Sequence, residues 1–282
     1  MTELFRQDVT AEANRSRSRK GNHLNLLIGG NKKVNNFSEE IKMKVIVCDN
    51  YDEMSKKAYE VMKPVLKDGA VIALATGTSP IGLYKCMAED YKKGNVSYKN
   101  IRSVNLDEYV GQGVGDEQSY VEFMRRNLFN NIDIDLKNTD LPNGKAADLE
   151  KEVERYNKKL AENPIDIQVL GIGSNGHIGF NEPGTAFDSL THVVDLTANT
   201  IKDNSRFFKS IDEVPKKALS MGIKNVMNAK KIVMVVNGAN KAKAVKAMIE
   251  GRVITDCPAS ILQLHPDCTV VLDKEAASLL TK

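Results

Sequence analysis

The sequence predicts an α/β fold built on one mostly parallel sheet, and two observations lead to this prediction. From Met43 onward, short runs of β-branched and other apolar residues alternate with segments whose apolar residues recur at helical spacing. Residues 70–75 are apolar throughout, as in strands that helices bury on both faces. We therefore expect a single-domain, doubly wound, Rossmann-like sheet with helices on both of its faces.

The pattern assigns strands and helices along the chain. Strands are expected at residues 44–47, 70–75, 101–106, 165–170, 231–236 and 269–272. Helices are expected at residues 54–66, 117–130, 147–162, 240–250 and 273–280. Pro64 should kink or stop the first of these helices, because proline removes a backbone donor. Another helix should begin after residue 79, since Ser79 can cap it and Pro80 suits the first helical position.

Residues 1–42 differ in charge from the rest of the chain. The 282 residues carry a formal net charge of +3, and residues 1–42 hold eight Lys/Arg and five Asp/Glu, so the remainder holds 32 of each sign. The short basic run at residues 15–20 lies in a polar segment, which is typical of a solvated tail. We predict a disordered basic extension over residues 1–42 and one domain over residues 43–282, with no nucleic-acid or membrane partner.

Composition also indicates a compartment. No run of 18 apolar residues occurs, and the first residues lack the basic and apolar regions of a secretory signal. The four cysteines, Cys48, Cys86, Cys257 and Cys268, show no C-x-x-C spacing, so neither a disulfide framework nor a metal site is expected. These observations predict a cytoplasmic protein without a bound metal.

The loop GIGSNGHIGFNEPG (residues 171–184) follows a predicted strand, and it begins with the G-x-G-x-x-G spacing of dinucleotide-binding turns. A dinucleotide site needs a helix directly after the turn, but Gly179, Pro183 and Gly184 oppose one here. The glycines, including Gly171, are expected instead to bring backbone amides close to a smaller ligand. No nicotinamide or flavin cofactor is predicted.

The same loop holds three polar side chains within eight residues: Asn175, His177 and Glu182. A histidine flanked by a carboxylate and an amide is held in one tautomer and can exchange a proton near neutral pH. The alternative is a structural histidine whose hydrogen bonds are satisfied within the loop. The high glycine content and the position after a strand favour the catalytic interpretation.

A phosphate site is indicated by the loop ATGTSP, residues 75–80. Backbone amides and hydroxyls at a helix start bind phosphate well, and the candidates here are Thr76, Gly77, Thr78 and Ser79. No Gly-Lys-Ser/Thr follows, so a phosphorylated small molecule fits better than a nucleotide. Arg206 and Lys241 are candidates to complete the site, because guanidinium and ammonium groups both bind phosphate. The alternatives are an ordinary strand-to-helix turn and two surface charges.

Adjacent acids, Asp107 and Glu108, end another predicted strand. A carboxylate placed there can remove a proton from carbon next to a carbonyl or imine group. Paired acids at a strand end are also common helix caps, so both interpretations stay open at this point.

Five motifs together resemble the glucosamine-6-phosphate deaminase family: LDEYVG, GIGSNGHIGFNEPG, DNSRFF, ATGTSP and the late LQLHP at residues 262–266. The resemblance runs from Met43 nearly to the C-terminus in the family's motif order. The 6-phosphogluconolactonases share the fold and a similar glycine-rich loop, but FNEP together with LDEY is similar to the deaminases. Residues 1–42 have no counterpart in the resemblance.

The resemblance implies a reaction, namely conversion of glucosamine 6-phosphate and water to fructose 6-phosphate and ammonia in amino-sugar catabolism, without a cofactor. It implies that His177, oriented by Glu182 and Asn175, assists opening of the sugar ring, and that Asp107 carries a proton from C2 to C1. Residues 76–79, Arg206 and Lys241 match the family's phosphate contacts, and Gly171 is assigned to substrate contact. Residues 195–212 resemble the family's mobile lid.

Two departures from the family pattern affect what is expected. Asn175 stands where some members have aspartate, and an amide can orient His177 but cannot share a proton as a carboxylate can. Members activated by N-acetylglucosamine 6-phosphate carry basic residues shortly after FNEP, whereas this chain has Ser-Leu-Thr-His-Val-Val at residues 189–194. We therefore expect no such activation.

Two other functions stay as alternatives. A lactonase of the same fold is one, although hydrolysing a lactone needs no proton removal at C2, which makes Asp107 superfluous. A non-catalytic sugar-phosphate sensor is the other, although a sensor needs the phosphate contacts and not His177 or Glu182. The sequence leaves the oligomeric state open between monomer and homo-oligomer.

Overall fold

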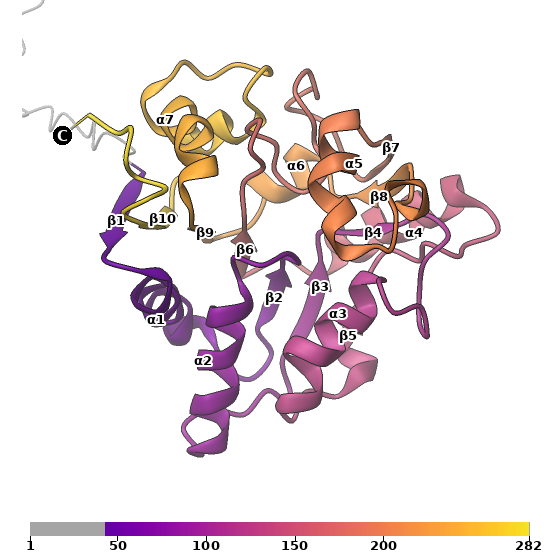
Figure 1. Ribbon diagram of the computed structural model, residues 1–282. Coiled ribbons are helices and arrows are strands. Elements are labelled where there is room, and N and C mark those ends of the chain that lie inside the picture. Colours follow the sequence, from indigo (N-terminus) through magenta and orange to yellow (C-terminus); the bar gives the residue numbers. More distant parts are fainter. Residues whose placement is uncertain (1–42, 282) are drawn as a thin grey trace, which may run out of the picture. The chain divides into compact units, whose positions relative to one another are not determined.

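The computed structural model describes residues 43–281, and the extension predicted over residues 1–42 lies outside them. The main sheet has seven strands in the order β1-β10-β9-β6-β2-β3-β5, all paired in parallel (Figure 1). The strands are β1 (Lys44–Cys48), β2 (Val71–Leu74), β3 (Arg102–Asn105), β5 (Thr139–Asp140), β6 (Ile167–Leu170), β9 (Ile232–Val236) and β10 (Cys268–Asp273). The predicted fold class is confirmed, and each predicted strand is present.

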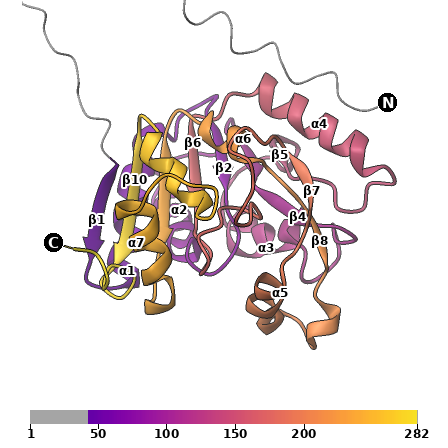
Figure 2. The ribbon, with the colours of Figure 1, turned by 90° about the horizontal axis from the view of Figure 1, so that it is seen from above.

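Helices cover both faces of this sheet (Figures 1 and 2). Crossovers between parallel strands are right-handed, so helices on connections that run in opposite directions along the sheet lie on opposite faces. One face carries α1 (Tyr51–Met62), α2 (Ile81–Lys92) and α3 (Tyr120–Asn127). The other carries α4 (Leu149–Glu162), α6 (Ile223–Met227) and α7 (Ala242–Glu250). This arrangement makes the sheet doubly wound, as predicted.

The strand order changes direction between β2 and β6. These strands are neighbours, but the chain leaves β2 toward β3 on one side and leaves β6 toward β9 on the other. Loops beyond the carboxyl ends of two such strands diverge and leave a crevice, where ligands of this kind of sheet bind. The loops at residues 75–80 and 171–184 both begin at this crevice.

Side-chain caps fix where several helices begin. Asn50 accepts a hydrogen bond from the backbone N–H of Glu53 (3.0 Å), which starts α1. Asp148 accepts one from the N–H of Lys151 (3.1 Å) and starts α4. Each cap stabilises its helix by about 1 kcal/mol. As predicted, α1 stops before Pro64, which lies in a 3₁₀ turn.

A second sheet was not predicted. It is antiparallel and consists of β4 (Asp107–Tyr109), β8 (Lys217–Ser220) and β7 (His192–Asp195), and α5 (Ala198–Asn204) lies on the connection from β7 to β8. Each of these strands has only three or four residues, and β4 begins with two acids, so none gives a clear periodic signal. The consequence for the site is that Asp107 lies in a strand and not in a loop.

Two predicted helix features are wrong. Residues 274–279 form turns, because the Asp273 carboxylate accepts hydrogen bonds from the N–H groups of Ala276 (2.7 Å) and Gly238 (3.0 and 3.1 Å). The segment is thereby tied to the turn before α7. The second error concerns α2, which begins at Ile81 with Pro80 in the capping position. Ser79 does not cap it but donates a hydrogen bond to the side chain of Asn237 (2.6 Å).

Candidate active site

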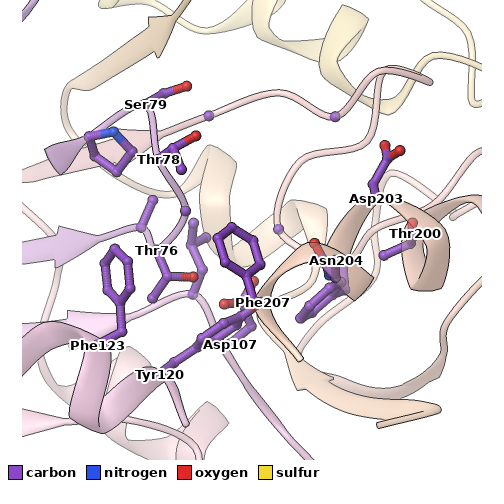
Figure 3. Close-up of a pocket in the computed structure, with 18 of the residues that line it drawn as sticks. Thr76, Thr78, Ser79, Asp107, Tyr120, Phe123, Thr200, Asp203, Asn204 and Phe207 are labelled. Atoms are coloured by element: carbon purple, nitrogen blue, oxygen red, sulfur yellow. The ribbon is translucent and has the colours of Figure 1, made fainter. Parts of the chain in front are cut away.

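A cavity of about 420 Å³ lies at the crevice between β2 and β6. Its wall comes from the loops after these strands, from β4 and α3, from α5 and from the turn before α7. Figure 3 shows the loop after β2 on one side, α5 on the other and Asp107 between them. Nine residues singled out in the sequence line the cavity: Thr76, Gly77, Thr78, Ser79, Asp107, Gly171, His177, Arg206 and Lys241.

Asp107 projects into the cavity from β4 and is 6% exposed. Burial, with a smaller contribution from the nearby charge of Glu108, raises the pKa of its carboxyl group to about 8. Gly179, at φ +57°, leaves room for it, since a Cβ there would lie 3.6 Å from Asp107 Oδ2 and 3.1 Å from Ser220 Oγ. A carboxyl group in this environment can exchange a proton near neutral pH.

Glu108 points away from this chemistry. Its carboxylate accepts hydrogen bonds from the backbone N–H groups of Tyr109 and Tyr120 (2.9 Å each) and Val121 (3.1 Å). It therefore satisfies two free donors at the start of α3, where Ser119 is the capping residue. Asp107 therefore lies in the cavity, as the proton-transfer interpretation requires, and Glu108 satisfies donors at the helix start.

His177 packs directly against the backbone of its own loop. A Cβ at Gly173 would lie 2.2–2.5 Å from three atoms of the His177 ring, so only glycine fits there. The buried Nδ1 of His177 has no hydrogen-bond partner among the described residues. The nearest carboxylate atom recorded for it is Glu182 Oε2, at 3.6 Å.

Glu182 and Asn175 lie behind His177 and do not line the cavity. Asn175 Nδ2 donates to Glu182 Oε2 (2.8 Å), and the hydroxyls of Thr197 (3.2 Å) and Thr200 donate to Oε1. Burial acts to raise the pKa of Glu182, but His177 and these donors outweigh it and lower the pKa to about 2. Glu182 is therefore ionised at neutral pH, and its Oε2 faces the His177 ring.

The loop after β2 is held rigidly. Gly77 adopts φ +91°, which side chains disfavour. The hydroxyl of Tyr51 donates to the carbonyl of Thr78 (3.0 Å) and accepts from the N–H of Gly82 (2.7 Å), which ties the loop to α1 and α2. The hydrogen bond from Ser79 to Asn237 ties it to the segment after β9. The loop thus presents preformed backbone and hydroxyl groups to the cavity.

Two basic residues approach the same end of the cavity from different elements. Lys241 ends the 3₁₀ turn Ala239–Lys241 before α7, and burial lowers its pKa while Asp203 opposes that effect. Arg206 follows α5, and its guanidinium carbon lies 4.7 Å from the centroid of the Phe207 ring. Positive charge from both sides of the cavity suits an anionic group such as a phosphate.

The sequence analysis missed other residues of the wall. The aromatic ones are Tyr109, Tyr120, Phe123, Phe180, Phe207 and Phe208, and the polar ones outside the predicted set include Gln118, Arg126, Asn127, Thr200, Asp203, Asn204 and Asn240. Several stand inside the quoted motifs, such as Tyr109 in LDEYVG and Phe207 in DNSRFF, so proximity to a motif was an available signal. Thr200 lies within residues 195–212, which resemble the family's lid, and just before DNSRFF, so the same signal was available for it. Phe123 had none, because the packing of α3 places it.

A comparison with family models gives a match over residues 49–271, to the family described as glucosamine-6-phosphate isomerases/6-phosphogluconolactonase. The chain belongs to this family. Glucosamine-6-phosphate deaminase of Thermoanaerobacter pseudethanolicus is 51% identical over 241 residues, which cover 84% of this chain and 95% of that protein. That of Clostridium novyi is 49% identical, over 84% of this chain and the whole of that protein.

Solved structures give a second comparison for this chain. A monomeric glucosamine-6-phosphate deaminase superposes with a TM-score of 0.82 at 46% identity, over 84% of this chain and 100% of that chain. The 6-phosphogluconolactonase of Trypanosoma brucei superposes at 0.69 with 18% identity, over 85% of this chain and 99% of that chain, and shows a shared fold only. The resemblance stated from the motifs is confirmed at the family level. Within residues 43–281, no helix is long and apolar enough to cross a membrane.

Proposed function

We propose that the protein is a glucosamine-6-phosphate deaminase, which converts glucosamine 6-phosphate and water to fructose 6-phosphate and ammonia. The observation that carries the proposal is Asp107, a buried carboxyl group in the cavity whose pKa of about 8 suits reversible proton transfer at carbon. The deaminase names of relatives at about half identity support the same conclusion. We place the reaction in amino-sugar catabolism and, from the composition, in the cytoplasm.

The first step assigned to this site is opening of the sugar ring. His177 gives a proton to the ring oxygen as the ring C1–O bond breaks, and the same imidazole takes the proton of the C1 hydroxyl, which leaves an aldehyde and returns His177 to its starting state. Glu182 and Asn175, behind His177, orient the imidazole. Because Asn175 is an amide, it takes part as a hydrogen-bond donor and not as a proton carrier.

The second step is proton transfer between neighbouring carbons. Asp107, ionised, removes the proton from C2, and the electron pair forms the C1–C2 double bond of an enolamine as the aldehyde oxygen gains a proton. The protonated Asp107 then returns the proton to C1, which leaves an imine at C2. Water adds to C2 and ammonia leaves, so the products are fructose 6-phosphate and ammonia. No electron acceptor is required at any step.

The phosphate of the substrate is assigned to the other end of the cavity. Thr76, Gly77, Thr78 and Ser79 offer hydroxyl and backbone donors there, and Arg206 and Lys241 offer charge. Gly171, which has open space where a Cβ would lie, lets the substrate approach the backbone. Fixing the phosphate holds C1 and C2 near Asp107, which is the positioning that a proton transfer between carbons needs.

Lactone hydrolysis is the alternative to be tested, since 6-phosphogluconolactonases share the fold. The purified protein should release ammonium and fructose 6-phosphate in equal amounts from glucosamine 6-phosphate, and it should hydrolyse 6-phosphogluconolactone far more slowly. Lactone hydrolysis without ammonium release would assign the protein to the sister activity. Binding of the sugar phosphate without either product would indicate a sensor.

A further inference from the structure

The two carboxylate oxygens of Glu182 contact different parts of the fold. Oε2 faces the catalytic loop, where it accepts from Asn175 Nδ2 (2.8 Å) and lies 3.6 Å from His177 Nδ1. Oε1 faces the first turn of α5, where it accepts from the hydroxyls of Thr197 (3.2 Å) and Thr200. Glu182 and Thr200 are 8% and 2% exposed, so water competes little for these contacts. The carboxylate therefore bridges the loop and the helix.

The helix α5 forms one wall of the cavity and has few other polar anchors. Asn204, at its end, donates to the hydroxyl of Tyr109 (2.9 Å), and Asp203 accepts from the hydroxyl of Ser174 (2.9 Å). The apolar residues beneath it form a small cluster separate from the main core. Any displacement of α5 from the cavity would withdraw both hydroxyl donors from Glu182 Oε1.

The Nδ1 atom of His177 has no hydrogen-bond partner among the described residues, and this relates the Glu182 bridge to the histidine. Leaving a buried polar atom without a hydrogen bond costs about 1–3 kcal/mol, so a partner that completes the bond should exist at some stage of turnover. Glu182 Oε2, at 3.6 Å, lies just beyond hydrogen-bonding distance. A movement of the carboxylate by less than about 1 Å toward the ring would make the bond.

We propose that Thr200 is a positioning residue for the reaction, and that its hydroxyl holds Glu182 in the orientation that directs Oε2 at His177 when α5 closes the cavity. The inference rests on the proposed function and adds a dependence of acid–base chemistry on the position of α5. Because Thr200 acts through Glu182, losing its hydroxyl should lower kcat and leave substrate affinity nearly unchanged.

The expected pH effect has a definite sign. Among the described residues, His177 is the titratable side chain that faces Glu182. From the start of α5, Glu182 is faced by two uncharged groups, the hydroxyls of Thr197 and Thr200. Hydrogen bonds donated to a carboxylate favour its charged form and lower its pKa. Removing the Thr200 hydroxyl should therefore raise the pKa of Glu182 and move the acid limb of the kcat profile to higher pH.

The test compares Thr200→Val, which keeps the shape and loses the hydroxyl, with Thr200→Ser, which keeps the hydroxyl. Lys202→Ala, on the exposed side of α5, is the control for altering the helix itself. We expect Thr200→Val to lower kcat about 10- to 100-fold, the usual effect of losing one hydrogen bond to a charged group, with KM changed less than about threefold. Thr200→Ser and Lys202→Ala should stay within about threefold of the unaltered protein.

Titration of the Glu182 carboxyl carbon by NMR, with and without Thr200→Val, gives a readout that does not depend on turnover. We expect the carboxyl pKa to rise in the variant. An unchanged pKa, an unchanged kcat, an increase in KM alone, or a Thr200→Ser variant as impaired as Thr200→Val would each overturn the inference. The unaltered protein could release no ammonium while the pKa of Glu182 still rose in Thr200→Val. That result would contradict the proposed function, but it would support the contact between Thr200 and Glu182.

Discussion

At the scale of single residues, the adjacent acids of β4 differ because their surroundings differ. Burial raises the pKa of both carboxyl groups, but three backbone N–H groups oppose the rise at Glu108, whereas no donor among the described residues opposes it at Asp107. Hydrogen-bond donors stabilise a carboxylate, and burial without them stabilises the neutral acid. Neighbouring positions thereby provide a structural acid and an acid that faces the cavity.

Replacing Asp107 should abolish turnover and change how stability depends on pH. Without the carboxylate, Asp107→Asn should lower kcat by at least about 10²- to 10⁴-fold while fructose 6-phosphate still binds. The pKa of Asp107 is about 8 in the folded protein and about 4 in an unfolded chain, so between these values the folded state holds a proton that the unfolded state lacks. Stability of the unaltered protein should therefore fall as pH rises, by at most about 1.4 kcal/mol per pH unit.

Urea unfolding of both proteins at pH 5, 7 and 9 measures this effect. The free energy of unfolding of Asp107→Asn, relative to the unaltered protein, should increase from pH 5 to pH 9. An equal difference at all three values would mean that the pKa of Asp107 is not raised in the folded protein.

Catalytic activity should depend on Gly173 as strongly as on His177. In Gly173→Ala, the added methyl group would overlap the imidazole, which must then leave its position or displace the loop. We expect kcat/KM to fall about 100-fold, since misplacing a catalytic group by about 1 Å has effects of this size. Gly113→Ala is the matched control, because a Cβ there meets only the flexible Lys145 side chain at 3.4 Å. Comparable kinetics of the two variants would contradict the steric role.

Much of the site could be predicted from the residues. Asp107 directly follows a predicted strand, and His177 lies in the glycine-rich loop after another, where polar side chains rarely serve packing. Thr200 could not be predicted in this way. Its contact with Glu182 depends on where the paired strands β7 and β8 hold α5, and no local pattern encodes that long-range pairing.

At the scale of elements, α3 depends on a residue outside it. In Glu108→Gln, an amide group would face a backbone N–H of the first turn in place of one carboxylate oxygen, so a hydrogen bond at the helix start would be lost. The free energy of unfolding should fall by about 1–3 kcal/mol. Chemical denaturation measures it, with exposed Glu117→Gln as the control. Equal stability of the two variants would show that Glu108 does not cap α3.

Elements were predicted well where local pattern and packing agree. The strands β2, β6 and β9 are buried along their whole length, so their apolar runs identify them. The segment at residues 274–279 shows the opposite case, since its helix-forming residues are held in turns by hydrogen bonds of Asp273 to Gly238 and Ala276. Tertiary contacts override local propensity there.

At the scale of the whole molecule, the reversal in strand order decides where chemistry occurs. Because β2 and β6 send the chain in opposite directions, the loop at residues 75–80 and the loop at residues 171–184 open onto one crevice. The alternation of strands and helices predicted the parallel sheet but not which strands would flank this crevice. The antiparallel sheet then adds Asp107 and α5 to the same space.

Regulation of the whole molecule should be simple, because the segment after the histidine loop already has its hydrogen bonds satisfied. The N–H of Lys224 donates to the carbonyl of Ser189 (2.9 Å), the N–H of Ile223 donates to its hydroxyl (3.0 Å), and His192 Nδ1 bonds to the carbonyl of Leu190 (2.8 Å). An anionic effector needs free donors or cations, and residues 189–194 contain neither Lys nor Arg.

Saturation curves for glucosamine 6-phosphate should therefore be the same with and without about 1 mM N-acetylglucosamine 6-phosphate. This concentration is about the upper end of the range of KM values of enzymes. Weak competition for the cavity would raise the half-saturating substrate concentration, because both sugars carry the same phosphate. Activation requires the opposite sign, since an effector that favours the active state lowers that concentration by its coupling energy. A clear decrease on adding the effector would mean that a second anion site exists outside the cavity.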